Sequence, residues 1–238
     1  LIDDAADADF DGKPDYENTK PIVFNTAEAA FLVGYAAASY SKSGIVATWG
    51  GMNFPTVTIF MDGFAQGVAY YNEQKGASVK VLGWTGDGET STFTGGFEAN
   101  DVAKTTAQNF IDQGADILLP VGGPIYQSAV AAIADSGKDI ALLGVDADLF
   151  ETDPSTQAII LTSILKGIKN ATFDVVTAAA GGDFSNEAYV GTLENEGVGY
   201  APFHNFESKV SPDLQGELDT IQAGIIDGSI TVTSYLKP

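Results

Sequence analysis

The sequence predicts an α/β fold built around a doubly wound parallel sheet, and three observations support this prediction. From Ile22 onward, short apolar runs rich in β-branched residues alternate with amphipathic stretches of helical length, and Gly, Asp, Asn or Pro separates them. The short runs are apolar throughout, which is typical of strands buried on both faces. Most runs are followed by a helical stretch, and this order indicates a parallel sheet with helices on both sides.

The strands are expected on the apolar runs, at Ile22–Phe24, Ile45–Trp49, Val79–Trp84, Ile117–Val121, Ile140–Val145, Ile159–Thr162 and Ala188–Leu193. The helices are expected where apolar residues recur at helical spacing, at Ala27–Tyr40, Val57–Asn72, Asn100–Gln113, Tyr126–Asp135, Ile164–Ala180 and Pro212–Ile226. In sheets of this class a ligand binds beyond the carboxyl ends of the strands. The loops expected there comprise residues 50–55, 85–97, 122–124 and 146–148.

Composition excludes several classes of function. The 238 residues, a length that fits one large domain or two unequal lobes, carry 32 acidic and 11 basic side chains, and the net charge is −21. Every basic residue is lysine, so nucleic acid and anionic membrane surfaces are poor partners. The absence of cysteine excludes disulfides, thiolate nucleophiles and thiolate metal sites. No run of about 18 apolar residues occurs, so no membrane-spanning segment is expected.

Signs of catalysis are few. The one histidine, His204, follows a proline in a predicted turn, and neither a Gly-x-Ser-x-Gly motif nor a second histidine accompanies it. Asp146 and Asp148 could act as an acid and a base, although two aspartates after a strand are more typical of loop capping. The glycine pairs after two strands lack the remaining residues of a phosphate-binding motif. A nucleoside- or sugar-processing α/β enzyme is therefore kept as the alternative.

Three residues near the predicted strand ends favour a neutral ligand that combines a sugar with a base. Phe97 lies between a strand and a helix, Asp146 ends a strand, and Lys166 is expected near the start of a helix. An aromatic ring offers a face to a planar base, a carboxylate accepts hydrogen bonds from hydroxyl groups, and an ammonium donates to them. Each residue taken alone is more typical of a structural role, so spacing by itself does not establish the site.

A resemblance to a known family rests on seven segments that occur in a fixed order. They are residues 31–38, 50–52, 60–67, 112–116, 144–148, 161–166 and 197–203, which read FLVGYAAA, GGM, FMDGFAQG, DQGAD, GVDAD, LTSILK and GVGYAPF. In this order they resemble the basic membrane protein (BMP, PnrA-like) family of ABC-transporter substrate-binding lipoproteins. The resemblance covers about residues 21–232.

The resemblance implies a type I periplasmic-binding-protein fold of two α/β lobes, with most of the first lobe absent from this chain. It further implies that the protein binds a nucleoside, most often a purine nucleoside, and delivers it to an ABC permease without catalysis. An extracytoplasmic location, through a lipid anchor absent from this chain, is expected with it. Residues 1–26 are expected to form the end of the first lobe, an acidic loop and a hinge, residues 27–157 the second lobe, residues 158–187 a segment that crosses back, and residues 188–238 the return to the second lobe.

Five site residues are carried over from this resemblance. Phe97 resembles the family's base-stacking aromatic, and Asp146 and Lys166 resemble its partners for the ribose hydroxyls. Gly122 is expected to contact the ligand through its backbone, and Asp3 resembles a first-lobe acid that faces the ligand. The lengthened loop before Phe97 also contains Phe93, which leaves a second candidate for the aromatic face. No metal or cofactor is expected at this site.

An acidic segment near the N-terminus is a candidate calcium loop. Residues 7–18 carry aspartates at loop positions 1, 3, 5 and 9 and glycine at position 6, the position of the sharp turn. Position 12 is Asn18 instead of a bidentate glutamate, with Glu17 one residue early. The segment is therefore either a structural calcium site or a solvated acidic loop.

Calcium titration separates these two alternatives. We expect isothermal titration calorimetry to detect heat of calcium binding for the parent chain and a loss of that heat for Asp9→Ala, because Asp9 would supply a ligand oxygen. If neither protein gives heat at millimolar calcium, the calcium site does not exist.

Overall fold

The computed structural model describes residues 1–7 and 14–236 and contains two β-sheets. The larger sheet has the strand order β3-β2-β4-β5-β6-β8. Its strands are β2 (Ile45–Gly50), β3 (Lys80–Leu82), β4 (Ile117–Val121), β5 (Ala141–Asp146), β6 (Ile160–Lys166) and β8 (Val198–Tyr200). The strands run parallel except β8, which pairs antiparallel with β6. The smaller sheet pairs β1 (Ile22–Phe24) with β7 (Tyr189–Gly191) in parallel.

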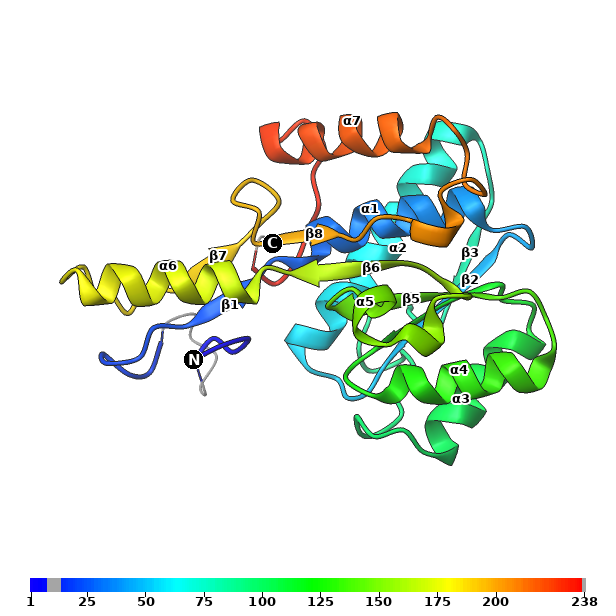
Figure 1. The fold of residues 1–238 in the computed structure, drawn as a ribbon, viewed down its shortest axis with the longest axis horizontal. Coiled ribbons are helices and arrows are strands. Elements are labelled where there is room, and N and C mark those ends of the chain that lie inside the picture. Colours follow the sequence, from blue (N-terminus) through cyan, green and yellow to red (C-terminus); the bar gives the residue numbers. More distant parts are fainter. Residues whose placement is uncertain (8–13, 237–238) are drawn as a thin grey trace.

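Helices cover both faces of the six-stranded sheet (Figure 1). On one face lie α1 (Thr26–Tyr40) and α2 (Pro55–Lys75), with α7 (Leu214–Asp227) against α1; on the other lie α3 (Asp101–Asp112) and α4 (Ile125–Ser136). Successive strand residues point to opposite faces. Accordingly, Leu118 and Leu142 pack in the α3–α4 core, whereas Leu119 and Leu143 pack in the α1–α2 core. The doubly wound α/β prediction is confirmed.

The contact between α1 and α2 is close enough to require glycine. A Cβ atom on Gly67 would overlap the carbonyl oxygen of Phe31, and one on Gly63 would overlap the carbonyl oxygen of Ala27. Both obstacles are backbone atoms, which cannot move aside without displacing the helix. The two helices therefore pack backbone against backbone, and this packing helps to place the first turns of α2 beside the carboxyl ends of the strands.

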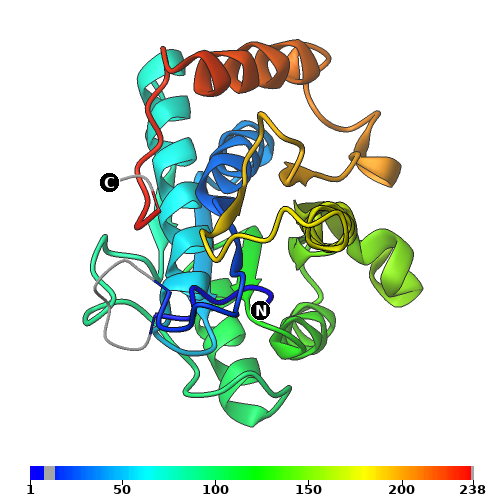
Figure 2. The ribbon, with the colours of Figure 1, turned by 90° about the vertical axis from the view of Figure 1, so that its left-hand side faces the viewer.

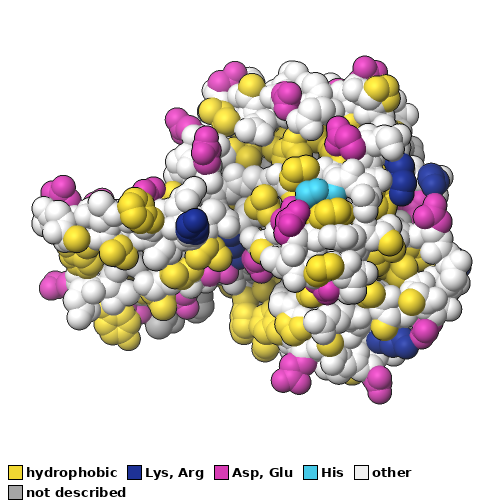
Figure 3. Space-filling view, in the orientation of Figure 1, with side chains coloured by type: hydrophobic (Ala, Val, Ile, Leu, Met, Phe, Trp, Pro, Cys, Tyr) yellow, Lys and Arg dark blue, Asp and Glu magenta, His cyan; other side chains and the backbone are white. Residues whose placement is uncertain are grey.

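A smaller part of the chain protrudes from this body and consists of β1, β7 and α6 (Ile168–Ala180) (Figures 1 and 2). Three connections join it to the body: from β1 into α1, from β6 into α6, and from β7 to β8. Ala171 is the one fully buried residue of α6, whereas Phe173 and Val176 are exposed. Apolar side chains are correspondingly visible along this protrusion in Figure 3.

The first and third of these connections are tied together by Glu28 of α1, whose side chain is buried. Its carboxylate accepts hydrogen bonds from Asn25 Nδ2 (2.9 Å) and from the backbone N–H of Leu193 (2.9 Å).

Neither α6 nor any other helix within residues 1–7 and 14–236 has both the length and the apolar character needed to cross a membrane.

Most expected elements are present, and one expectation is wrong in a way that concerns the site. The helix expected at Ile164–Ala180 begins at Ile168, because Ile164–Lys166 continue strand β6: all three residues pair with β8, and the first two also pair with β5. Strand β8 and the one-turn helix α5 (Leu149–Thr152) were not expected, since neither has a long apolar run. Strand β3 is shorter than expected and covers Lys80–Leu82.

The segment boundaries expected from the sequence fall within this arrangement as follows. Residues 158–187 contain β6, which belongs to the six-stranded sheet, and then α6, which lies in the protrusion. Residues 188–238 contain β7, which pairs with β1, and the chain rejoins the six-stranded sheet at β8.

The close contact of α1 and α2 leads to a prediction on stability. Gly67→Ala should lower the free energy of unfolding by about 1–3 kcal/mol, because the added methyl group meets backbone and not a flexible side chain. Gly216→Ala on α7 is the matched control: nothing lies within 4 Å of its Cβ position, so it should raise stability by about 0.5–1 kcal/mol. Urea unfolding of both variants measures the difference, and equal effects would contradict the helix packing described above.

Candidate functional site

A cavity of about 170 Å³ lies where strands β4, β5 and β6 end, and all five site residues expected from the sequence line it. Its lining residues are Asp3, Thr56, Val57, Phe60, Phe97, Val121, Gly122, Gly123, Val145, Asp146 and Lys166. Val121, Asp146 and Lys166 are the last residues of three parallel strands, which brings their carboxyl ends to one edge of the sheet. Helix α2, the loop before α3 and the N-terminal segment close the remaining sides.

Lys166 provides a buried positive charge at the centre of this cavity. Its side chain is 4% exposed, and its Nζ lies 2.7 Å from Asp3 Oδ2 and 2.9 Å from Asp146 Oδ1. The ammonium also lies 4.8 Å from the centroid of the Phe60 ring, within the range of a cation–π interaction. A lysine this deeply buried requires an opposite charge, and here two carboxylates supply it. Lys166 reaches this position as the end of β6, and not as the start of a helix as was expected.

Asp146 is held in an unfavourable backbone conformation at the same place. Its φ is +69°, a left-handed value that costs an ordinary residue about 1–3 kcal/mol. Its Oδ1 atom is buried, and none of the described residues donates a hydrogen bond to it, because the approach of Lys166 lacks hydrogen-bond geometry despite the 2.9 Å distance. The Asp146 side chain as a whole is 44% exposed, so the outer part of its carboxylate can accept a hydrogen bond from a ligand hydroxyl, while Oδ1 faces Lys166.

Phe97 forms an aromatic wall that depends on two glycines. A Cβ atom on Gly122 would lie 2.5 Å from the Phe97 ring, and one on Gly51 would overlap the ring. Gly122 has φ +131°, a conformation that favours glycine on its own account. The loop that carries Phe97 is tied to Gly51, the residue after β2, since the backbone N–H groups of Gly95 and Gly96 donate to the Gly51 carbonyl at 2.9 and 3.0 Å.

The second aromatic candidate, Phe93, is not part of the cavity lining. Its ring packs beside Gly50, so that a Cβ atom there would lie 2.8 Å from it. Of the two phenylalanines, Phe97 is therefore the one that faces the cavity.

The cavity offers the rings of Phe60 and Phe97, hydrogen-bond acceptors and one cation. His204 lies outside its lining. The histidine Nε2 lies 2.8 Å from Asp148 Oδ2, and its ring stacks on Phe150 with centroids 3.9 Å apart. Among the residues that the structure describes, no three metal-ligating side chains come together. The calcium loop expected at residues 7–18 includes residues 8–13, which lie outside the described residues.

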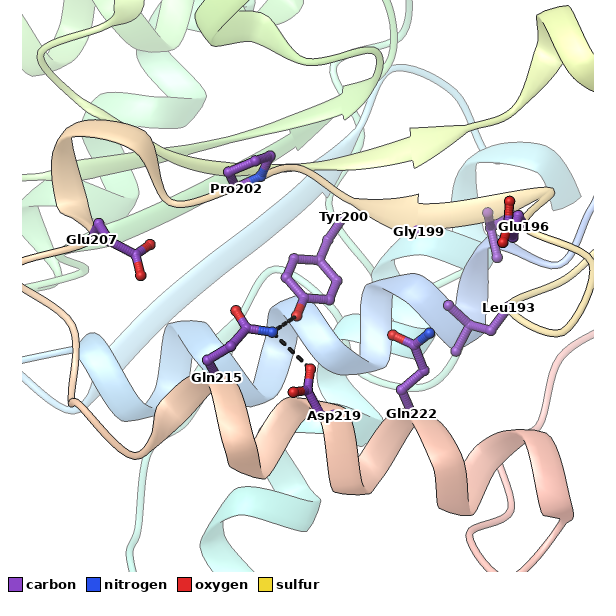
Figure 4. A pocket seen from close by; sticks show the side chains of 10 residues that line it. Leu193, Glu196, Gly199, Tyr200, Pro202, Glu207, Gln215, Asp219 and Gln222 are labelled. Carbon is purple, nitrogen blue, oxygen red and sulfur yellow. Dashed lines mark hydrogen bonds between the residues drawn. The ribbon is translucent and has the colours of Figure 1, made fainter.

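A larger hollow of about 450 Å³ lies between β8 and α7 (Figure 4). Tyr200 points into it from β8, and the Tyr200 hydroxyl oxygen accepts a hydrogen bond from Gln215 Nε2 at 2.9 Å. Burial raises the pKa of the Tyr200 hydroxyl. Gln215 also donates to Asp219, and carboxylates of Glu196 and Glu207 line the ends. This hollow is not predictable from apolar periodicity, because the three residues of β8 are too short a run to be recognised as a strand. It shares no residue with the cavity around Lys166, which combines a buried charge with the strand ends.

The fold and the position of the cavity define the class of protein: an α/β protein with the type I periplasmic-binding-protein fold. An ABC-transporter solute-binding protein from Aeropyrum pernix K1 superposes with a TM-score of 0.78 at 24% identity, over 98% of this chain and 70% of that one. A Bacillus halodurans protein described as a transcriptional activator of the comK gene superposes with a TM-score of 0.73 at 20% identity, over 92% of this chain and 69% of its own. At these identities the likeness concerns the fold.

The family follows from the sequence comparisons. The family model for PnrA-like ABC transporter substrate-binding proteins matches residues 1–230, so the chain belongs to this family. Basic membrane protein D of Borreliella burgdorferi is 26% identical over 221 residues, which cover 91% of this chain and 59% of that protein. An uncharacterized lipoprotein of Pyrococcus furiosus is 32% identical over 138 residues, 55% of this chain and 33% of its own. The chain thus spans about three fifths of Basic membrane protein D. Both the fold class and the family resemblance are confirmed.

The ion triad formed by Asp3, Lys166 and Asp146 leads to a prediction on stability that needs no ligand. Asp3→Asn and Asp146→Asn should each have a small effect on the free energy of unfolding, because each leaves Lys166 one carboxylate. The double variant leaves a buried ammonium without a counter-charge, a situation that costs about 3–5 kcal/mol. Urea unfolding of the four proteins should therefore show a double variant that is much less stable than the sum of the singles. Additive effects would contradict the triad.

Proposed function

We propose that the protein is the solute-binding component of an ABC importer and that it binds a nucleoside, with a purine nucleoside as the favoured ligand, in the cleft that contains the Lys166 cavity. The observation that carries the proposal is the single cavity lined by Phe97, Asp146 and Lys166. Membership of the substrate-binding family supports the general role. The choice of a nucleoside rests on the chemistry of the lining.

The ring of Phe97 would stack on the base, since a flat apolar face suits any planar heterocycle. The exposed part of the Asp146 carboxylate would accept a hydrogen bond from a ribose hydroxyl, while Oδ1 stays against Lys166. Lys166 has three ammonium protons, and two anions engage it from within the protein, so a further proton is available to a ribose oxygen.

Asp3 and Gly122 would support the three ligand-binding side chains. Asp3 would hold Lys166 in place from the N-terminal segment, through the 2.7 Å contact. Gly122, which has no side chain, would let the ligand and the Phe97 ring approach the backbone.

The partners and the location follow from the same proposal. The six-stranded sheet with its helices would be the second lobe, and β1, β7 and α6 would belong to the first lobe. The ligand would be delivered to an ABC permease at the membrane, where a lipid anchor would hold an extracytoplasmic protein; the lipoproteins among the relatives support this location. A structural calcium ion at residues 7–18 remains a separate proposal.

Calorimetry on the full-length protein with inosine, guanosine, adenosine, cytidine and ribose tests the proposed ligand. Asp146→Ala and Lys166→Ala should each weaken nucleoside binding about tenfold or more, since each removes a hydrogen bond to a charged group. Phe97→Ala should weaken nucleosides more than ribose, because stacking on a base contributes about 1–3 kcal/mol and ribose has no base.

Matched controls are available for two of these variants. Lys169→Ala and Asp139→Ala remove the same charges from exposed positions outside the cavity and should bind as the parent does. Unchanged nucleoside affinity of Asp146→Ala, or ribose as the best ligand, would refute the nucleoside site. Release of free base during incubation, detected by chromatography, would favour the enzymatic alternative instead.

A further inference from the structure

His204 lies next to the loop that carries Asp146, although it is distant from Asp146 in the sequence. Its Nε2 lies 2.8 Å from Asp148 Oδ2, and because a carboxylate has no proton to give, Nε2 is the donor. The other oxygen, Asp148 Oδ1, accepts from the backbone N–H of Phe150 at 3.0 Å and so caps helix α5. Both oxygens of Asp148 are therefore engaged, one by the helix and one by the histidine.

The histidine is itself firmly placed. Its ring stacks on Phe150 with centroids 3.9 Å apart and an interplanar angle of 10°, and its side chain is 17% exposed. Phe203 and Phe206, which flank it in the sequence, are buried in the core. Asn205 Nδ2 donates to the carbonyl oxygen of Gln157 at 3.1 Å. This segment is thus a fixed support against which the α5 loop rests.

Asp146 needs such a support because its backbone conformation is unfavourable. The strand β5 ends at Asp146, whose φ of +69° is the left-handed value already described. The backbone N–H of the next residue, Ala147, donates to the Val145 carbonyl at 2.8 Å. This is the one backbone hydrogen bond that the described residues give the loop between Asp146 and Asp148. The first firm attachment after Asp146 is the cap at Asp148, followed by the 3.1 Å bond from the backbone N–H of Leu149 to Ser163 Oγ.

We propose that His204 is a positioning residue for the ligand site: by holding Asp148, it keeps the loop in the one conformation that directs the Asp146 carboxylate into the cavity. The part of this inference that concerns affinity rests on the proposed function. The histidine belongs to the segment after β8, which enters from the protrusion. The placement of this returning segment is therefore coupled to the placement of a ligand-binding carboxylate.

Three variants isolate the hydrogen bond from the other roles of the residue. His204→Phe keeps a ring to stack on Phe150 and removes the donor, whereas His204→Gln keeps an amide donor and removes the ring. Tyr126→Phe is the matched control, because it removes a 2.9 Å bond to Asp153, the aspartate that caps the next helical turn, and leaves Asp148 untouched.

Two measurements are needed on each variant. Amide hydrogen exchange followed by mass spectrometry reports the order of peptides that cover residues 144–152, and calorimetry with inosine on the full-length protein reports the site. For His204→Phe we expect exchange in these peptides to be about fivefold faster and inosine binding to be about tenfold weaker. For His204→Gln and Tyr126→Phe we expect values close to those of the parent.

The outcomes distinguish this inference from the proposed function. Unchanged exchange in residues 144–152 of His204→Phe overturns the inference whatever the ligand is. A lower melting temperature of His204→Phe without a change in exchange shows a merely structural histidine and overturns it as well, as does a His204→Gln variant that exchanges as fast as His204→Phe. Failure of the parent to bind any nucleoside overturns the proposed function, while the exchange data still decide whether His204 orders the loop.

Discussion

An ammonium group that is 4% exposed needs anions within contact distance, and Lys166 has two of them from distant parts of the chain. Asp3 belongs to the N-terminal segment and Asp146 to the end of β5, so one cation ties three segments together. The requirement for charge balance explains why both carboxylates turn toward the cavity despite their left-handed backbone conformations. The site geometry is in this sense a consequence of burying one lysine.

Much of this arrangement is predictable from the sequence because apolar periodicity reports burial. The strands, the helices and the meeting of their loops at one edge follow from that periodicity. Asp146 stands at the end of a predicted strand and Phe97 in a predicted loop, whereas Lys166 was expected in a helix and ends strand β6 instead. The helix expected to begin at Ile164 shows the limit of the method. Ile164–Lys166 are compatible with either element, and pairing with β5 and β8, which no local pattern reveals, decides in favour of a strand.

The segments that carry the family resemblance have two different physical roles. Residues 31–38 and 60–67 form the contact of α1 with α2, where glycine is required because backbone meets backbone. Residues 144–148 and 161–166 instead include the strand ends that bear the charges of the cavity. A short motif that looks functional can therefore be a packing motif, and only the structure separates the two kinds. The hollow beside Tyr200 is a further case: residues 197–203, which carry part of the resemblance, supply one of its walls, yet no pattern in them predicts a hollow.

The three connections between the protrusion and the body also have a mechanical meaning. Three connections of one chain restrict the sliding of the two bodies past each other more than their rotation about an axis through the connections. Lys166 stands at the start of one connection, directly before α6, and is therefore close to that pivot. Displacement in a rotation grows with distance from the axis. The ion triad can consequently persist through such a movement, while the far end of α6 sweeps the widest arc.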